Sequence, residues 1–228
     1  LTAAEIDALG ALEVPVALVG ASAPSFWSVR IDDEDGANKA VQHLLNLGHR
    51  QIGLIRGVPN EPMRFTAPVD RRTGYQTALR RAGITVDPRL EAPADFTVEG
   101  GATAMAELLA LAEPPTAVFA QSDELALGAL RTLRRMGLRV PGDMSVVGFD
   151  DHEMAELFEL TTIAQRVVEQ GVLVAGQVLD ALLSDGAAQP AEIIVPTRLV
   201  VRASTAPRSS DVSLYSATPR SMRRSMRP

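Results

Sequence analysis

Two adjacent carboxylates, Asp150 and Asp151, follow an apolar run at residues 144–149. The run predicts a fully buried strand, and acids at the end of such a strand indicate an enzyme, a metal site or a binding cleft. Because adjacent residues point in different directions, the pair is not expected to share one proton as a catalytic dyad does. We expect one carboxylate to enter a cleft and the other, Asp151, to cap the helix that follows.

Other motifs of catalysis or metal binding are absent or incomplete. The sequence has no cysteine, and its three histidines lie far apart without ligand spacing. It contains no dinucleotide fingerprint, P-loop or nucleophile elbow. The stretch "IDDEDG" at 31–36 looks like a calcium loop, but Ile31 and Gln42 stand at two ligand positions, so it is interpreted as a helix start. Composition leaves Ser–His–Asp catalysis open without supporting it; we predict no enzyme activity, metal or cofactor.

Apolar strands and helices alternate along the chain. The expected strands are 14–19, 29–31, 51–57, 90–96, 116–120, 144–149, 160–163 and 192–202. The expected helices are 32–47, 70–82, 98–111, 123–136 and 167–183, with a short one after Asp151. The alternation predicts an α/β fold whose parallel sheet is covered on both faces. Ligands bind at the carboxyl ends of such strands, which places Phe96, residues 121–123 and the two carboxylates at a functional edge.

Length, composition and charge narrow the class of protein. The 228 residues are enough for one large domain or two smaller lobes. No apolar run approaches the roughly 18–20 residues of a membrane helix, and the first ten residues lack the features of a signal peptide. Together with the absence of cysteine, this fits a cytoplasmic protein without a membrane partner. The net charge of −6 combines +4 in residues 207–228 with −10 in residues 1–206, and so acidic a body is a poor surface for nucleic acid.

Six blocks of the sequence form an ordered series. They are "IDDEDGANKAVQHLLNLGHRQIGLIRG" (31–57), "DRRTGYQTALRRAGI" (70–84), "ADFTVEGGATAMAELL" (94–109), "PTAVFAQSDELALGALRTLRRMGLRVPGDMSVVGFDD" (115–151), "LTTIAQ" (160–165) and "RLVVRAST" (198–205). In this order they resemble the ligand-sensing domain of the LacI/GalR family of bacterial transcription regulators. The resemblance implies a periplasmic-binding-protein type I fold, with two Rossmann-like parallel-sheet lobes and a small molecule between them.

The resemblance assigns five residues to an effector site. Asp150 matches the family's aspartate that accepts hydrogen bonds from the effector, and a carboxylate suits hydroxyl donors. Arg71 matches the cleft arginine, whose guanidinium pairs well with hydroxyls or a carboxylate. Phe96 matches a stacking platform, with core packing as the alternative. Ser122 stands where the family usually has Asn, and Gln165 matches a residue near the hinge and cleft. The implied effector is a sugar or a related metabolite.

The resemblance also assigns a contact between two copies of the chain. Leu127 and Leu130, on the helix expected at 123–136, and Phe158 are apolar at positions where the family packs its partner subunit. Without a partner these side chains would form an exposed apolar patch. A homodimer is therefore expected.

The same resemblance divides the chain into lobes. Residues 1–31 and 164–190 match an incomplete N-terminal lobe, and residues 32–163 and 191–206 match a C-terminal lobe. Residues 207–228, rich in Ser, Arg and Pro, are expected to be a disordered basic tail. The family's helix-turn-helix domain has no counterpart here, so operator DNA would be bound only through a missing N-terminal domain. The alternative is a solute-binding protein of a sugar transporter, which shares the fold.

Overall fold

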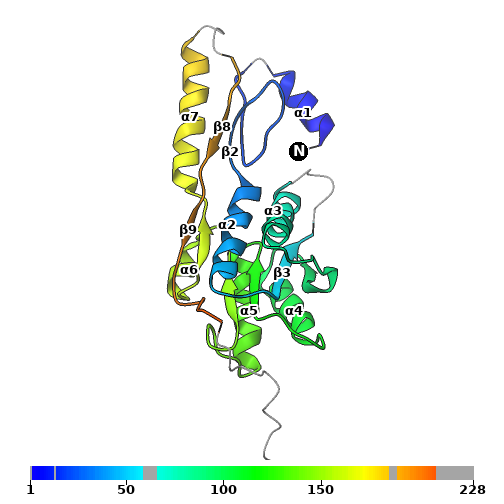
Figure 1. Cartoon of the computed structure of the whole chain (residues 1–228). Helices are drawn as coiled ribbons and strands as arrows, with labels where there is room; N and C mark the ends of the chain where they lie inside the picture. Colours follow the sequence, from blue (N-terminus) through cyan, green and yellow to red (C-terminus); the bar gives the residue numbers. More distant parts are fainter. Residues whose placement is uncertain (1, 13, 59–65, 185–188, 209–228) are drawn as a thin grey trace, which may run out of the picture.

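The computed structural model describes residues 2–12, 14–58, 66–184 and 189–208. It has two lobes of unequal size, each built around a sheet (Figure 1). The described chain passes between the lobes near residues 32, 165 and 196. The predicted α/β class with parallel sheets is confirmed.

The smaller lobe combines a three-stranded parallel sheet with two helices. Its strands, in the order β1-β2-β8, are β1 (Ala17–Val19), β2 (Trp27–Ile31) and β8 (Glu192–Val195). Its helices are α1 (Ala3–Gly10) and α7 (Val167–Leu183), and α7 lies along the sheet (Figure 1).

The pairing of β8 with β2 corrects one boundary expected from the sequence. Residues 191–206 were predicted to belong to the larger lobe, and 192–202 to form one extended segment, but residues 192–195 lie in the smaller sheet. Pro196 has no N–H with which to continue the ladder. The segment resumes beyond it as β9 (Arg198–Val200), which pairs antiparallel with β7 (Thr162–Ala164).

The larger lobe contains a four-stranded parallel sheet. Its strands, in the order β4-β3-β5-β6, are β4 (Glu91–Ala94), β3 (Ile52–Gly57), β5 (Ala117–Ala120) and β6 (Ser145–Val147). Its helices are α2 (Asp33–Asn46), α3 (Ala67–Arg81), α4 (Val98–Leu109), α5 (Asp123–Arg135) and α6 (Glu153–Leu157), with a 3-10 turn, η1 (Pro88–Leu90). The positions of these elements agree with the sequence pattern to within a few residues.

The central strand β5 shows why this sheet needs helices on both faces. Ala117 and Phe119 pack in the apolar cluster formed with α2 and α3. Val118 and Ala120 pack in the cluster formed with α4 and α5. All four side chains are fully buried, as expected for a parallel strand covered on both sides. Because β3, β5 and β6 are parallel neighbours, their carboxyl ends meet at one edge of the sheet. This edge faces the smaller lobe (Figure 1).

Two helix starts differ from the sequence expectation. Helix α1 was not predicted, although Thr2 and Glu5 form a capping box at its start. Helix α3 begins at Ala67 rather than Asp70, with a proline in its first turn, where the missing N–H is tolerated. Residues 209–228 of the tail expected at 207–228, and residues 59–65 of the loop expected at 57–68, lie outside the described residues. Within the described ranges, no helix is long and apolar enough to cross a membrane.

Candidate ligand-binding site

The turn after β6 presents the carboxylate of Asp150. Asp150 and Asp151 have φ angles of 121° and 58°, a region uncommon for residues other than glycine. The N–H of Asp150 donates to the carbonyl of Ile163 at 2.8 Å. Its Oδ1 accepts a hydrogen bond from the Gln165 side-chain amide and lies 3.4 Å from Nη1 of Arg71. The predicted grouping of Arg71, Asp150 and Gln165 is present in the structure.

Arg71, on α3, is held from several sides and is only 5% exposed. Its Nε donates to Oδ1 of Asp33 at 2.7 Å, and its Nη1 donates to the carbonyl oxygen of Gln121. The guanidinium carbon lies 3.7 Å from the centroid of the Phe149 ring, a cation–π arrangement. The guanidinium is thus oriented before any ligand arrives, which lowers the entropic cost of binding.

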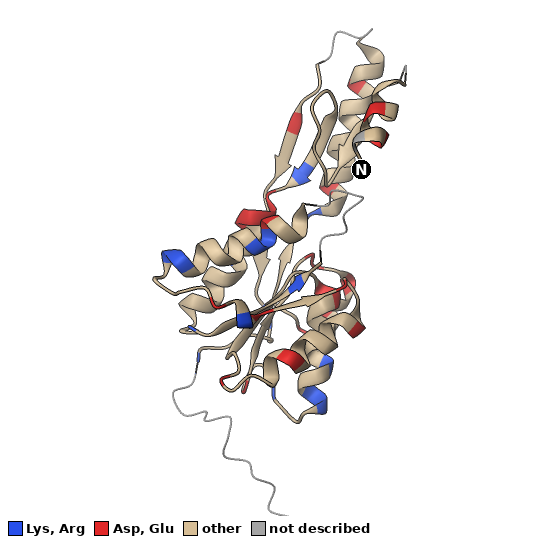
Figure 2. Cartoon of the chain, turned by 90° about the vertical axis from the view of Figure 1, so that its right-hand side faces the viewer, with Lys and Arg blue, Asp and Glu red and all other residues tan. Residues whose placement is uncertain are grey.

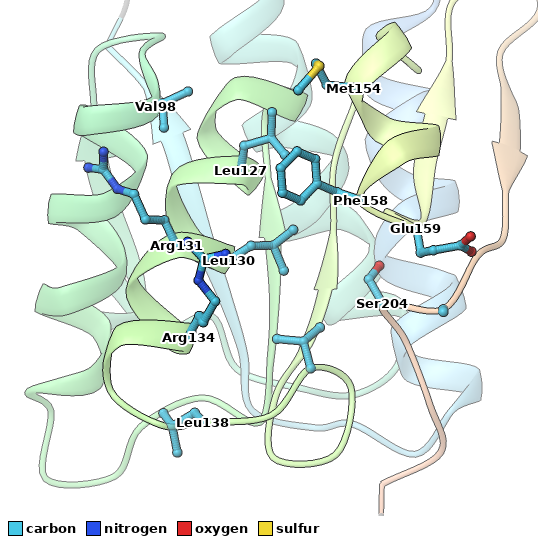
Figure 3. A pocket seen from close by; sticks show the side chains of 12 residues that line it. Val98, Leu127, Leu130, Arg131, Arg134, Leu138, Met154, Phe158, Glu159 and Ser204 are labelled. Carbon is cyan, nitrogen blue, oxygen red and sulfur yellow. The ribbon is translucent and has the colours of Figure 1, made fainter.

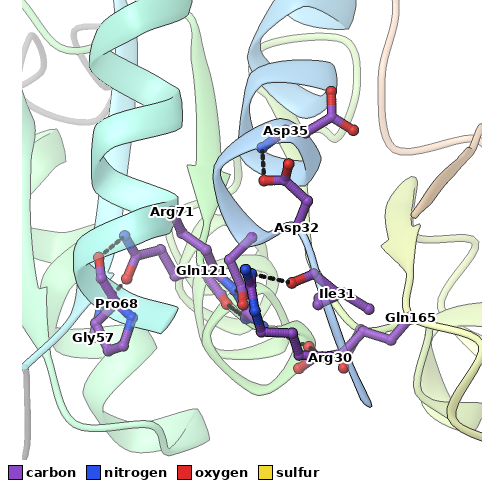
Figure 4. A network of polar contacts seen from close by, with 11 residues as sticks. Arg30, Ile31, Asp32, Asp35, Gly57, Pro68, Arg71, Gln121 and Gln165 are labelled. Carbon is purple, nitrogen blue, oxygen red and sulfur yellow. Dashed lines mark hydrogen bonds and ion pairs between the residues drawn. The ribbon is translucent and has the colours of Figure 1, made fainter. Parts of the chain in front are cut away.

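Gln121 connects the strand ends to α3 and is fully buried. Its Oε1 accepts from the N–H of Gly57 at 2.9 Å, and its Nε2 donates to the carbonyl of Pro68 at 3.0 Å (Figure 4). The sequence pattern places Gln121 at this edge without assigning it to the site, and Asp33 is expected there only as part of a helix start. The available signal for Gln121 was a polar residue directly after an apolar strand.

Burial is the largest influence on the carboxylates of this site. It raises the pKa of Asp150 to about 7, although the Arg71 charge and the Gln165 hydrogen bond both lower it. Burial also raises the pKa of Asp33, again against the charge of Arg71. The Asp150 side chain nevertheless keeps 28% of its surface exposed. It therefore titrates near neutral pH while it remains accessible to a ligand.

The raised pKa of Asp150 predicts a pH-dependent contribution to stability. The folded state holds this proton up to about pH 7, whereas the unfolded state releases it near pH 4. Lowering the pH from 8 to 6 should therefore stabilise the wild-type protein by about 1 kcal/mol relative to Asp150→Asn. Urea unfolding of both proteins at the two pH values measures this difference. A wild type that loses stability relative to Asp150→Asn over this range would contradict the raised pKa.

A hollow of about 560 Å³ opens beside Asp150. Asp150, Asp151, Ala164, Arg198 and residues 166–169 at the start of α7 line it. Its volume falls within the roughly 300–1,000 Å³ of small-molecule pockets. Charged and apolar groups share its wall, which suits a polar organic ligand. No group of three or more metal-ligating side chains occurs in the described part of the chain.

Two predicted site residues have other contacts. The hydroxyl of Ser122 caps α5 by accepting a hydrogen bond from the N–H of Leu125 at 3.2 Å, and Ser122 is 3% exposed. Phe96 is half-buried against the α4–α5 cluster, and its ring covers Gly57 so closely that a Cβ there would lie 2.1 Å from it. Direct contact of Phe96 and Ser122 with an effector stays a prediction.

The expectation that Asp151 caps the following helix is wrong. The side chain of His152 caps α6 instead, accepting from the N–H of Met154 at 3.3 Å. Asp151 forms an ion pair with Arg202 at 2.7 Å. The left-handed backbone at Asp151 turns its side chain toward the chain after β9, so the cap passes to the next residue.

The three residues expected at a subunit contact lie around one apolar groove. Leu127 and Leu130 of α5 are partly buried, and Phe158, after α6, is 45% exposed. They converge on a groove of about 550 Å³ (Figure 3). The other lining residues are Val98, Arg131, Arg134, Leu138, Val140, Met154, Glu159, Ala203 and Ser204. The groove is thus apolar in its centre and charged at its rim.

Comparison with known proteins supports this fold. The profile of the periplasmic binding protein-like domain matches residues 41–205. The transcriptional repressor CytR of Escherichia coli (strain K12) is 47% identical over 146 residues, which cover 63% of this chain and 42% of that protein. The crystal structure of a LacI transcriptional regulator from a Rhodococcus species has a TM-score of 0.80 and 34% identity, and the match covers 91% of this chain and 75% of that chain.

A third similar protein is the transcriptional regulator CelR in a structure of its complex with cellobiose, with a TM-score of 0.75 and 37% identity. The match covers 84% of this chain and 59% of that chain. The fold and the profile together define the class, a periplasmic binding protein-like domain. Within that class, the chain belongs to the LacI family of transcriptional regulators. It spans about half the length of the curated relatives CytR and CelR.

Proposed function

We propose that this chain is the effector-sensing and dimerisation part of a LacI-type transcriptional regulator. The observation that carries the proposal is the Asp150 carboxylate, which Arg71 and Gln165 hold beside a ligand-sized hollow. The site lies near the passages between the lobes, so a bound molecule could change their relative orientation. The relatives are regulators, which favours this role over that of a transport solute-binding protein or an enzyme.

The proposed effector is a sugar or a related polyhydroxylated metabolite. The carboxylate of Asp150 accepts hydrogen bonds from hydroxyl groups, and the Arg71 guanidinium donates to their oxygens. The CelR relative was solved in complex with cellobiose, which supports a sugar for this site as well. Phe96 could contribute a stacking surface if its ring moves from its packing over Gly57.

A ligand screen tests the proposed site. Thermal unfolding of the protein should be measured with sugars, nucleosides and purines, beginning with cellobiose, and calorimetry should give the affinity of each compound that raises the Tm. We expect a polyhydroxylated compound to bind the wild type and to bind Asp150→Ala more weakly. A compound that binds both proteins equally would place the effector elsewhere. Failure of every sugar and nucleoside at millimolar concentration would contradict the proposed ligand class.

We assign operator recognition to a helix-turn-helix outside this chain, in a protein that acts in the cytoplasm. Specific reading of base pairs needs an element that enters a groove of the DNA, usually a helix. The helices α2 to α5 instead pack their apolar faces against the sheet. Basic and acidic residues alternate over the larger lobe (Figure 2), and residues 1–206 carry a net charge of −10, so phosphate would be repelled.

Residues 1–228 alone should therefore not bind operator DNA specifically. A gel-shift assay with the DNA upstream of the gene, competitor DNA and ~150 mM salt measures this, because salt at that level screens most non-specific attraction. Only weak, salt-sensitive and sequence-independent binding is expected, through the arginines of residues 207–228. A discrete complex that resists competitor would show that the DNA-binding function resides in this chain.

We further propose that the apolar groove of Leu127, Leu130 and Phe158 is the contact between two copies of the chain. The centre of the groove is apolar, while Arg131, Arg134 and Glu159 place both signs of charge at its rim. A two-fold interface brings the same patch together from both subunits. Apolar centres surrounded by polar rims are characteristic of such contacts.

A further inference from the structure

One buried carboxylate outside the site ties together three segments of the larger lobe. Asp123, the first residue of α5, is fully buried. Its Oδ2 accepts from the backbone N–H of His152 at 2.8 Å, and its Oδ1 accepts from the hydroxyl of Thr162 at 2.6 Å. The carboxylate therefore links α5 to the turn after β6 and to the start of β7.

The turn held by Asp123 is the one that presents Asp150. Two consecutive residues there, Asp150 and Asp151, have positive φ, a conformation that persists only where the surroundings fix it. Before the turn, the N–H of Gly148 donates to the carbonyl of Thr161 at 2.9 Å. After it, the N–H of His152 donates to Asp123. Asp150 and Asp151 thus lie between two hydrogen-bonded backbone groups, the N–H of Gly148 and the N–H of His152. Asp123 accepts the second of these hydrogen bonds.

The packing leaves this carboxylate little freedom to move. A Cβ added at Gly148 would lie 2.2 Å from Oδ1 of Asp123, so a larger residue there would collide with the carboxylate. The carboxylate of Asp123 also suits its surroundings chemically. Both of its partners donate hydrogen bonds, and an ionised carboxylate accepts at each oxygen. Burial raises its pKa to about 6, with both hydrogen bonds opposing.

We infer that Asp123 is a positioning residue of the effector site: it fixes the turn at 148–152 and thereby sets where the Asp150 carboxylate points, without facing the ligand itself. The inference rests on the proposed function only in taking Asp150 as the effector-binding carboxylate. Removing Asp123 should let the turn relax and expose Asp150 to water. Asparagine should preserve the turn, because its amide oxygen accepts from His152 and its NH₂ group donates to the hydroxyl of Thr162.

The test follows Asp150 itself, so it requires no ligand. The carboxyl carbon of Asp150 and the amide of His152 are observed by NMR across a pH titration of the 228-residue chain. The proteins are the wild type, Asp123→Ala, Asp123→Asn and Leu108→Ala, in which Leu108 is a buried residue of the α4–α5 cluster. Leu108→Ala is the control for general destabilisation, and the Tm of each protein is recorded.

The Asp123 charge raises the pKa of Asp150, so its loss lowers that pKa in Asp123→Ala and in Asp123→Asn alike. In Asp123→Ala we expect the titration midpoint of Asp150 to fall by about one pH unit more than in Asp123→Asn, toward that of a solvated aspartate. The His152 amide resonance should move in the same variant. Asp123→Asn should keep the wild-type His152 resonance, and Leu108→Ala should change only the Tm. The inference is overturned if Asp123→Ala and Asp123→Asn shift the Asp150 titration equally, or if Leu108→Ala shifts it as much as Asp123→Ala does. Failure of the proposed function is a separate outcome. In that case the Asp150 titration and the His152 resonance would behave as expected, but the chain would bind no compound of the ligand screen.

Discussion

Arg71→Ala should weaken effector binding by about 10- to 150-fold, a loss of about 1.5–3 kcal/mol. The variant removes the charged donor beside Asp150. In the wild type, Asp33 and the carbonyl of Gln121 hold this guanidinium in a fixed orientation. Asp150→Ala should lose affinity in the same range, because the charged acceptor is removed. Calorimetry with the compound identified in the ligand screen measures both values.

Arg71→Ala should also lower the free energy of unfolding by about 2–4 kcal/mol. Removing one partner leaves Asp33 and Asp150 partly buried without their counter-charge, although Asp150 limits the cost by taking up a proton near pH 7. Arg72→Ala is the matched control for affinity: Arg72 is the next residue of α3 and pairs with the buried Glu91 instead, so this variant also loses an ion pair but should keep the wild-type affinity. Equal affinity in Arg71→Ala, Asp150→Ala and the wild type would exclude this site.

Replacing Leu127 and Leu130 together with glutamate should convert a dimer into a monomer. Each introduced carboxylate would have to be desolvated in the apolar centre of the groove, in both subunits at once, and like charges would face each other across the two-fold axis. The expected result is complete dissociation at micromolar concentration. Light scattering coupled to size-exclusion chromatography gives the mass directly.

The control for this experiment places two glutamates on an apolar surface elsewhere. Val168 and Val172 of α7 are 82% and 67% exposed, so Val168→Glu with Val172→Glu adds the same charge outside the groove. This control should remain a dimer. A wild type that is already monomeric would contradict the proposed interface, and dissociation of the control alone would move the interface to α7.

The fold could be predicted from local sequence patterns because its main signals are local. The strands β3, β5 and β6 of the larger sheet lie in short, mainly apolar runs that are each followed by a helix. The helix starts at Ser122 and Asp32 carry side chains that cap them. The exception is the segment after residue 191. Its sequence predicts one extended stretch, but residues 192–195 pair with β2 of the smaller lobe and residues 198–200 pair with β7. No local signal in it states that Ile193 pairs with Val29, 164 residues earlier.

The site was predicted less completely because its contacts join distant segments. The resemblance brought out Arg71, Asp150 and Gln165, whose residue types carry obvious chemistry. It could not show that Asp33 holds Arg71, because a carboxylate at a helix start already has a sufficient local explanation. The partner of Asp151 is Arg202, 51 residues away, so an expectation based on neighbouring residues gave the wrong role.

The strand order β1-β2-β8 has a consequence for how the chain acquires its structure. The larger sheet uses strands from residues 52–147 and can be complete as soon as that stretch is available, whereas the smaller sheet joins residues 17–31 to residues 192–195. Closing so long a loop carries an entropic cost that only the final pairing offsets. During synthesis the larger sheet can therefore form first, and the edge of β2 that later pairs with β8 stays unpaired until residues 192–195 are made.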